Sequence, residues 1–321
     1  PYARLTPDVI LRALESAGFS CDGRLLALNS YENRVYQVGI DDAAPLVAKF
    51  YRPGRWSKQA ILEEHAFSQE LAAQEIPVIA PFTDSRGESL HELEGFLFAA
   101  YPRCGGRWPD LDSKQDLQQM GRFLGRMHAV GATRHFRHRS RLDIKTLGDA
   151  SRRLLLERGF IPDYLVDAYG TLSDDLLKQI RAQFEAAGFI DQIRLHGDCH
   201  KGNILWTDTG PHFVDLDDSC SGPAIQDIWM LLSGEADEMR VQLEELLEGY
   251  QTFFEFNFSS VMLIEGLRTL RMLNYAAWIA RRWEDPAFPA AFPWFDSPRY
   301  WEDHILSLRE QAAALNSPPI L

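Results

Sequence analysis

Three oxygen-bearing side chains in the second half of the chain have the types and spacing needed to hold a metal ion beside a reacting hydroxyl group. Asp198 lies in a polar turn, Asn203 follows five residues later, and Asp215 comes directly after a short apolar run. A carboxylate can accept a hydrogen bond from a hydroxyl group and aim it, and Mg²⁺ prefers oxygen ligands. We therefore predict that Asp198 orients and finally deprotonates a hydroxyl group, and that Asn203 and Asp215 bind Mg²⁺.

The segment around Asp198 matches a known catalytic-loop pattern. Residues 196–205 read His-Gly-Asp-Cys-His-Lys-Gly-Asn-Ile-Leu, which fits the H-x-D-x-x-x-x-N spacing of protein kinases. In such a loop the aspartate positions the attacking hydroxyl, and a second aspartate after a strand binds metal between the β- and γ-phosphates. Asp215 occupies that second place, so we predict that it is catalytic as well as metal-binding. The expected chemistry is transfer of the γ-phosphoryl group of ATP.

A lysine in the first quarter of the chain is a candidate phosphate ligand. Lys49 stands near the end of the strand-like run 46–50, which resembles the V-A-I-K strand whose lysine meets the α- and β-phosphates. A lysine at a strand end is usually only solvated. Its significance rises because the following helix carries Glu63 and Glu64, near the spacing expected for a Lys–Glu ion pair, and of the two we favour Glu64.

The remaining nucleotide contacts are predicted from two further segments. The glycine-rich loop of protein kinases is absent, and a polar turn at 28–36 stands in its place. Its Ser30 hydroxyl and backbone N–H groups could contact phosphate oxygens, or the turn could be an ordinary hairpin tip. The strand-like run 96–101 precedes a Gly-containing linker, so we expect backbone groups near Ala100 and Tyr101 to bind adenine.

The elements that must position these residues change character along the chain. Strand-like runs occupy much of 25–51 and 90–101, with a helix near 57–71 between them, whereas most of the rest has helical periodicity. Only a strand-like island at 193–214 interrupts the helices. We predict an α+β, protein-kinase-like, two-lobed fold, with a small mixed sheet in a nucleotide-binding lobe (1–101) and a large helical catalytic lobe (102–321).

Composition excludes several other classes of function. The net charge of −13 argues against general binding of nucleic acid or of an anionic membrane, which needs clustered Lys and Arg. The four cysteines are scattered, without a C-x-x-C pair or a secretory signal, and no apolar run approaches the length of about 20 residues that spans a bilayer. A reduced cytoplasm is the expected compartment, and the oligomeric state is left open.

Longer stretches of sequence resemble a known family. The combination of HGDxHxxNIL, VDLDD and QDIW is similar to the aminoglycoside phosphotransferase and choline kinase superfamily, and the closer resemblance is to the stress response kinase A (YihE/RdoA) family. That family consists of cytoplasmic serine/threonine protein kinases, so the resemblance implies ATP, Mg²⁺, a protein substrate and an ATP site at Ser30. The segments that carry the closer resemblance are 29–37, 49–53, 196–200 and 281–289.

Three alternatives stay open at this point. A small-molecule kinase acting on an amino alcohol, sugar or aminoglycoside would use the same phosphate-handling residues. A metal-dependent hydrolase could use His196, Asp198 and His200, but would leave Lys49 unexplained. A pseudokinase scaffold is disfavoured because the four expected site residues are intact. The aromatic tail 278–295 reads either as core or as a lid over the acceptor site.

Overall fold

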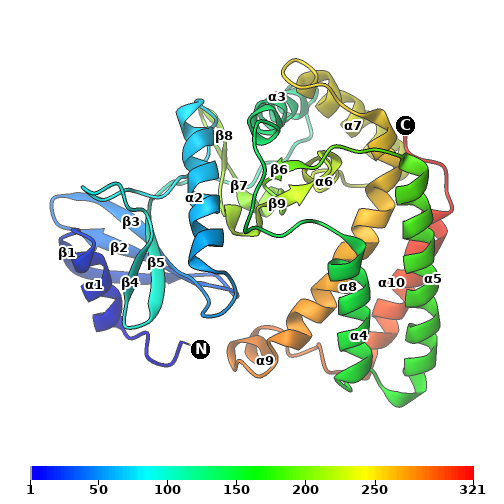
Figure 1. Cartoon of the computed structure of the whole chain (residues 1–321), viewed down its shortest axis with the longest axis horizontal. Coiled ribbons are helices and arrows are strands. Elements are labelled where there is room, and N and C mark those ends of the chain that lie inside the picture. The colour runs from blue at the N-terminus through cyan, green and yellow to red at the C-terminus, as the bar shows by residue number, and fades with distance from the viewer. Residues whose placement is uncertain (1) are drawn as a thin grey trace.

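One antiparallel sheet and two helices form the N-terminal lobe (Figure 1). The computed structural model describes residues 2–321. The strand order is β1-β2-β3-β5-β4. Helix α1 (Pro7–Ser16) begins after Thr6, whose hydroxyl accepts a hydrogen bond from the Val9 N–H, and helix α2 (Lys58–Ala73) is capped by Ser57. The strands are β1 (Cys21–Leu28), β2 (Arg34–Ile40), β3 (Ala43–Phe50), β4 (His91–Leu93) and β5 (Phe96–Pro102).

Side chains along β3 alternate between the two faces of the sheet, one packed on α1 and the other on α2. Leu46, Ala48 and Phe50 are buried in an apolar cluster with α1, and Val47 packs with the cluster that contains Ile61 of α2. Because successive side chains of a strand point to opposite faces, Lys49 lies on the α2 side. The alternation therefore turns Lys49 toward the helix that carries Glu64.

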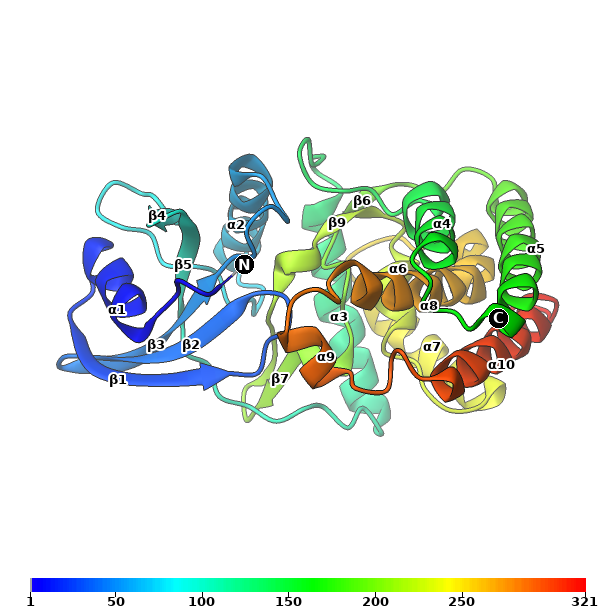
Figure 2. The ribbon, with the colours of Figure 1, turned by 90° about the horizontal axis from the view of Figure 1, so that it is seen from below.

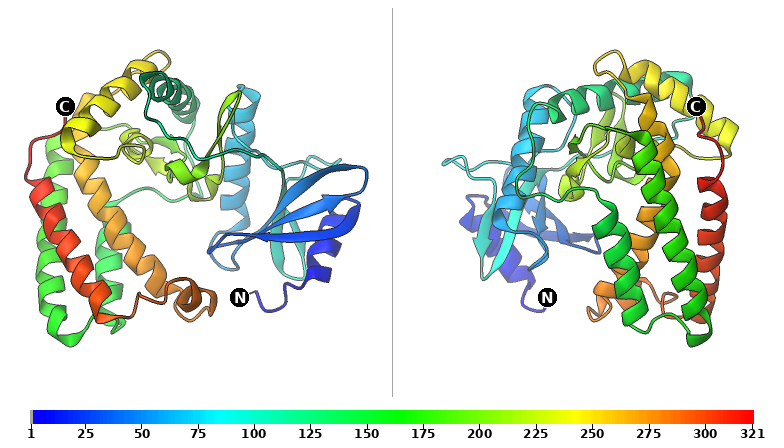
Figure 3. Two further views of the ribbon diagram at one scale, coloured as in Figure 1. Left: turned by 180° about the vertical axis from the view of Figure 1, so that it is seen from behind. Right: turned by 45° about the vertical axis from the view of Figure 1, so that its right-hand side comes forward.

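Helices dominate the C-terminal lobe, in which β6 (Ile193–Leu195) pairs with β9 (Cys220–Gly222) and β7 (Ile204–Thr207) pairs with β8 (Gly210–Phe213). Figure 3 shows α5 and α10 side by side at the end of the molecule far from the β1–β5 sheet. Within residues 2–321, no helix is both long and apolar enough to cross a membrane. The helices are α3 (Lys114–Gly131), α4 (Ala150–Glu157), α5 (Asp163–Ala187), α6 (Ile225–Trp229), α7 (Ala236–Tyr250), α8 (Ile264–Arg281), α9 (Ala287–Ala291) and α10 (Pro298–Leu315).

The predicted α+β, two-lobed architecture is confirmed, and three short elements were not foreseen. These are α4 with the π-helical turn that precedes it (Lys145–Asp149), strand β9, and α9. Each is short or polar, so periodicity over a window of residues does not reveal it. Strand β9 exists because β6 and the segment 140–142 pair with it on either side.

Glycine residues allow α3 and α7 to pack in backbone contact. A Cβ atom at Gly121 would lie 2.0 Å from the carbonyl oxygen of Leu246, and one at Gly125 would lie 2.4 Å from that of Tyr250. Neither clash can be relieved by moving the end of a side chain, because the opposing atoms belong to the backbone of α7. The close approach matters for the site because α3 also carries His128, described below.

We predict that Gly125→Ala destabilises the protein by about 2 kcal/mol or more, because overpacking outweighs the gain of about 1 kcal/mol in helix propensity. Gly170→Ala in α5 is the matched control, since the nearest atoms to an added Cβ there are side-chain atoms at 3.9 and 4.0 Å. The control should be neutral or more stable than wild type. Urea unfolding compares the three proteins, and equal midpoints for both variants would contradict the packing described here.

Candidate active site

A buried aspartate in the large lobe holds the catalytic loop in shape. Asp227 of α6 accepts hydrogen bonds from the backbone N–H groups of His196 and Gly197, both at 2.9 Å, and from Nε2 of His128 at 3.1 Å. The His196 ring is itself buried and its Nε2 lies 2.9 Å from the carbonyl oxygen of Val214. His196 is therefore structural, and Asp227 anchors the loop.

Gly197 is required by the geometry of the same loop. Its φ is +85°, and a Cβ atom there would lie 2.2 Å from the carbonyl oxygen of Asp218. Both the positive φ and the close approach favour glycine. The next residue, Asp198, is thereby turned toward the space between the lobes.

Asp198 is surrounded by hydrogen-bond donors. Its Oδ1 lies 2.5 Å from Nη1 of Arg271 on α8, and its Oδ2 lies 3.3 Å from Nδ2 of Asn203 and 3.4 Å from Nε2 of His200. Burial would raise the pKa of the Asp198 carboxyl, but His200 and Arg271 outweigh it and hold that pKa well below its usual range. Asp198 is therefore an ionised hydrogen-bond acceptor, able to orient a hydroxyl group.

Asp215 stands in a strained backbone conformation beside Lys49. It follows β8 with φ +59° and ψ +61°, the left-handed region that a non-glycine residue rarely adopts. Its Oδ1 lies 2.7 Å from Nζ of Lys49, and its side chain remains 54% exposed to the space between the lobes. Strain of this kind gathers at functional sites, and here it presents a carboxylate toward the loop that holds Asn203.

Asn203 and Asp215 suit a divalent cation. The Asn203 amide donates through Nδ2 to the carbonyl oxygen of Asp198 at 2.9 Å, which leaves Oδ1 as its available ligand atom. The backbone N–H of Val214 bonds to the carbonyl oxygen of Asn203 at 3.0 Å, so the two segments that carry the ligands are tied together. An amide oxygen and a partly exposed carboxylate form the oxygen donor set that Mg²⁺ prefers.

A second carboxylate, Asp217, joins the two lobes. It is buried and accepts hydrogen bonds from Nδ2 of Asn33 at 3.0 Å and from Arg55, and Nζ of Lys49 lies 3.5 Å away. Burial opposes its ionisation, but Lys49 and Arg55 outweigh that effect and hold the pKa of Asp217 well below its ordinary value. Its neighbour Asp218 also pairs with Arg55. The sequence motif VDLDD does not by itself assign roles to Asp217 and Asp218, and the structure shows Asp217 as a buried counter-ion for Lys49.

The predicted Lys49–Glu64 ion pair is not formed, because Lys49 contacts Asp215 and Asp217 instead. Glu64 is 2% exposed, and within residues 2–321 no donor reaches its Oε2. Burial raises the pKa of Glu64 to about 7, although Lys49 partly opposes the shift. Glu63 points elsewhere and accepts the backbone N–H groups of residues 137–139. Of the two glutamates, Glu64 is the one that faces the lysine.

An interlobe cavity of about 670 Å³ brings most of the predicted residues together, among them Ser30, Lys49, Glu64 and Tyr101. Ala100 does not line it, because this residue is buried in the sheet and its carbonyl accepts the Phe82 N–H at 2.8 Å. We therefore expect adenine to lie near residues 101–104 and not near Ala100. The apolar walls, which fit a nucleobase, are Leu28, Val35, Val47, Ile79, Leu205 and Trp108.

The turn at the mouth of the cavity is attached to the large lobe. Glu32 accepts hydrogen bonds from Nε1 of Trp278 at 2.7 Å and from Nε of Arg282 at 3.0 Å. Figure 2 shows α9, which follows this part of α8, beside the ends of β1 and β2. We call this contact the interlobe clasp. Its other members are an ion pair between Arg52 and Asp285 at 2.7 Å and ring packing of Tyr31 on Phe292.

The clasp resolves the two interpretations of the aromatic tail. Phe288, Phe292 and Phe295 are buried in the helical core, whereas Trp278 lines the cavity. The tail is therefore mainly core, and its first part contributes a wall of the site. Sequence reasoning missed Glu32, Arg271 and Arg282 because their partners lie far away along the chain.

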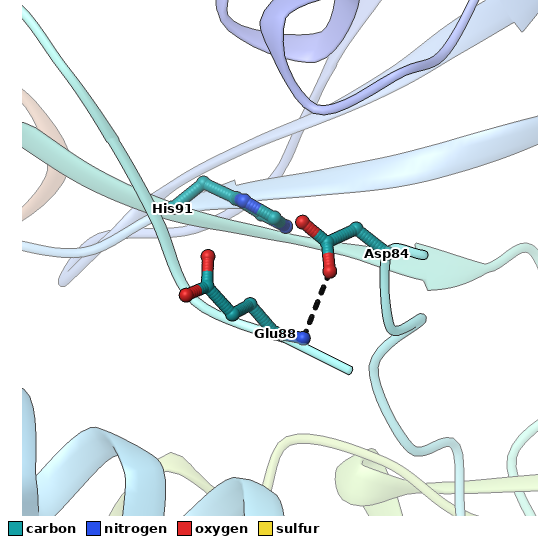
Figure 4. Close-up of side chains that lie close together, drawn as sticks. All are labelled: Asp84, Glu88 and His91. Atoms are coloured by element: carbon teal, nitrogen blue, oxygen red, sulfur yellow. Dashed lines mark hydrogen bonds between the residues drawn. The ribbon is translucent and has the colours of Figure 1, made fainter. Parts of the chain in front are cut away.

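A separate carboxylate–histidine cluster lies in the small lobe, away from this cavity. Ligand atoms of Asp84, Glu88 and His91 lie within 4.8 Å of one another (Figure 4). Asp84 accepts the backbone N–H groups of Arg86 and Glu88, and Arg86 also pairs with Glu88 at 2.9 Å. These contacts already give Asp84 and Glu88 partners within a capped turn.

Comparison with known proteins agrees with the fold and the site. The model of the phosphotransferase enzyme family matches residues 24–264. Among solved structures, amicoumacin kinase hAmiN in complex with AMP-PNP, Ca²⁺ and Ami superimposes with a TM-score of 0.75 at 19% identity, over 97% of this chain and 94% of that one. The molecule is thus a phosphotransferase with a kinase-like fold.

Closer relatives define the particular group. Stress response kinase A of Escherichia coli O157:H7 is 44% identical over 319 residues, covering 99% of this chain and 96% of that protein. The serine/threonine protein kinase RdoA of Salmonella typhimurium LT2 is 42% identical over 323 residues, with the same coverage. The chain belongs to the phosphotransferase enzyme family and, within it, to the stress response kinase A family.

The buried Glu64 generates a prediction about stability and pH. Its pKa is about 7 in the folded protein against 4.5 for an ordinary glutamate. The folded state therefore holds this proton more tightly, so the associated stability is complete below about pH 4.5 and is lost as the pH rises through about 7. Ligand-free Glu64→Gln should exceed wild type in stability at pH 8 by roughly 2–3 kcal/mol, and differ little at pH 4.5.

Urea unfolding at the two pH values provides the measurement, with Glu310→Gln on the exposed face of α10 as the matched control. The control should show the pH dependence of wild type. If Glu64→Gln were no more stable than wild type at pH 8, the carboxylate would have to be stabilised by contacts other than those described.

Proposed function

We propose that this chain is a cytoplasmic serine/threonine protein kinase of a bacterial stress response. The observation that carries the proposal is the convergence of Lys49, Asp198, Asn203 and Asp215 on one interlobe cavity. The names of two similar proteins, stress response kinase A and serine/threonine protein kinase RdoA, support a protein acceptor and a role in stress. In this proposal residues 1–101 bind the nucleotide, and residues 102–321 supply the catalytic loop and the acceptor site.

Each site residue has a defined task in the transfer. Lys49 binds nucleotide phosphate oxygens, with Ser30 in the turn above them, and Glu64 faces Lys49 from α2. Asn203 and Asp215 hold Mg²⁺, which neutralises charge on the β- and γ-phosphates when bound. Lys49 must then exchange part of its contact with Asp215 for phosphate. The carboxylate of Glu64, which lacks a partner at Oε2, is the group that can follow Lys49 as it shifts.

Asp198 performs the proton transfer. The acceptor hydroxyl oxygen bonds to the γ-phosphorus, the bond from that phosphorus to the β–γ bridging oxygen breaks, and its electron pair leaves with ADP. The hydroxyl proton passes to Asp198 late in the reaction. Because the pKa of this carboxyl is held low, Asp198 contributes mainly by orientation, as expected for phosphoryl transfer.

A small-molecule acceptor is the second candidate, and one observation favours it. A side cavity of about 450 Å³, which we call the acceptor cavity, adjoins Asp198 and is bounded by the clasp residues Tyr31, Glu32 and Trp278. Bounded sites of this size suit small ligands. A peptide would have to enter with its hydroxyl-bearing side chain first, past α8 and the segment 140–147.

We expect Asp198→Asn to lower turnover by about a thousandfold or more while ATP still binds, because the substitution removes the proton acceptor and keeps the shape. Asp208→Asn, in the exposed turn between β7 and β8, is the matched control and should keep full activity. The measurement is transfer of labelled γ-phosphate to generic protein substrates and to a panel of amino alcohols and sugars. Near-normal turnover of Asp198→Asn would contradict the mechanism, and label on small molecules alone would select the second candidate.

A further inference from the structure

The carboxylates of the acceptor cavity are already paired, unlike those expected in a site that binds amines. Three carboxylates line it, those of Glu32, Asp198 and Asp218. Each already has a charged partner: Glu32 pairs with Arg282, Asp198 with Arg271, and Asp218 with Arg55. A cationic acceptor would therefore have to compete with an arginine at every carboxylate in the wall.

Two arginine side chains of the wall keep unused hydrogen-bond donors. Arg271 is bonded to Asp198 through Nη1, and its side chain is still 44% exposed. Arg141 lines the same cavity and is exposed, and among the described residues 2–321 no acceptor bonds to its guanidinium group. Guanidinium groups form strong, often bidentate, hydrogen bonds with carboxylate and phosphate oxygens. The wall thus offers two places for an anion.

The backbone around Arg141 has a defined position relative to the catalytic loop. The backbone of residues 140–142 pairs with β9, since the Leu142 N–H donates to the Ser221 carbonyl at 2.8 Å and the Ser221 N–H donates to that of Ser140 at 2.9 Å. Strand β9 in turn pairs with β6, which leads directly into the catalytic loop. The backbone of Arg141 is therefore bonded to the small sheet that leads into the loop of Asp198.

We propose that the acceptor of this kinase carries an anionic group beside its hydroxyl, and that Arg141 and Arg271 bind that group. The proposal rests on the proposed function and commits to a serine or threonine next to acidic residues of a protein. Binding would also free Asp198: the acceptor hydroxyl must bond to this carboxylate, and an anion on the acceptor offers Arg271 a replacement partner. The anion itself takes no part in bond making or breaking.

Because of the net charge of the chain, a preference for acidic residues beside the acceptor hydroxyl would point to the site itself. At −13, the protein as a whole repels acidic peptides, so non-specific attraction would favour basic ones. A preference for acidic flanks can therefore come only from local positive groups such as Arg141 and Arg271.

The test uses serine peptides that are identical except for Glu, Gln or Lys at the flanking positions, together with free hydroxy acids and amino alcohols. The wild-type enzyme should use the Glu-flanked peptide with a kcat/KM about tenfold or more above that of the Lys-flanked peptide. Arg141→Glu should reduce or reverse this ratio, with the ATP KM as a check of the fold. Arg299→Glu on α10, which makes the same change of net charge, should leave the ratio unaltered.

The outcomes separate this inference from the proposed function. Equal use of the three peptides, or a ratio that Arg141→Glu does not change, would overturn the inference and leave a protein kinase in place. Label on hydroxy acids but on no peptide would support the anionic acceptor and overturn the protein substrate. Label on amino alcohols in preference to hydroxy acids would overturn the anionic acceptor.

Discussion

The buried carboxylate of Asp217 is the interaction on which the rest of the site depends. An ionised group removed from water is costly unless cations and hydrogen-bond donors compensate it. Asp217 comes from the large lobe, and the side chains that contact its carboxylate directly, those of Asn33, Lys49 and Arg55, come from the small lobe. The same carboxylate thus holds the lobes together and aims Lys49 at Asp215.

The clasp adds a second connection between the lobes, on the side away from the linker at 102–113. Because Glu32 is held by Trp278 and Arg282, the turn that replaces a glycine-rich loop has a defined position without glycine residues. Tyr31, Glu32 and Trp278 line both the interlobe cavity and the acceptor cavity. The two cavities therefore share a wall, so a substitution in the clasp alters the lining of both.

Several site features follow from contacts that no local pattern indicates. The sequence placed adenine near Ala100 and Tyr101, but the register of β5 against β3 buries Ala100 and leaves Tyr101 at the cavity. It paired Lys49 with Glu64, whereas two carboxylates from the other lobe compete for the lysine. The carboxylates near the acceptor cavity are paired with arginines that lie far away along the chain.

The sequence by itself determined the α+β architecture and placed Asp198, Asn203, Asp215 and Lys49. These inferences were possible because hydrophobic periodicity and loop spacing are local properties, which a few neighbouring residues specify. Only the tertiary structure decided that Arg271 contacts Asp198, because α8 and the catalytic loop are far apart along the chain. Such pairs are selected by packing and by the cost of leaving a buried charge unpaired. The spacing of neighbouring residues reveals neither effect.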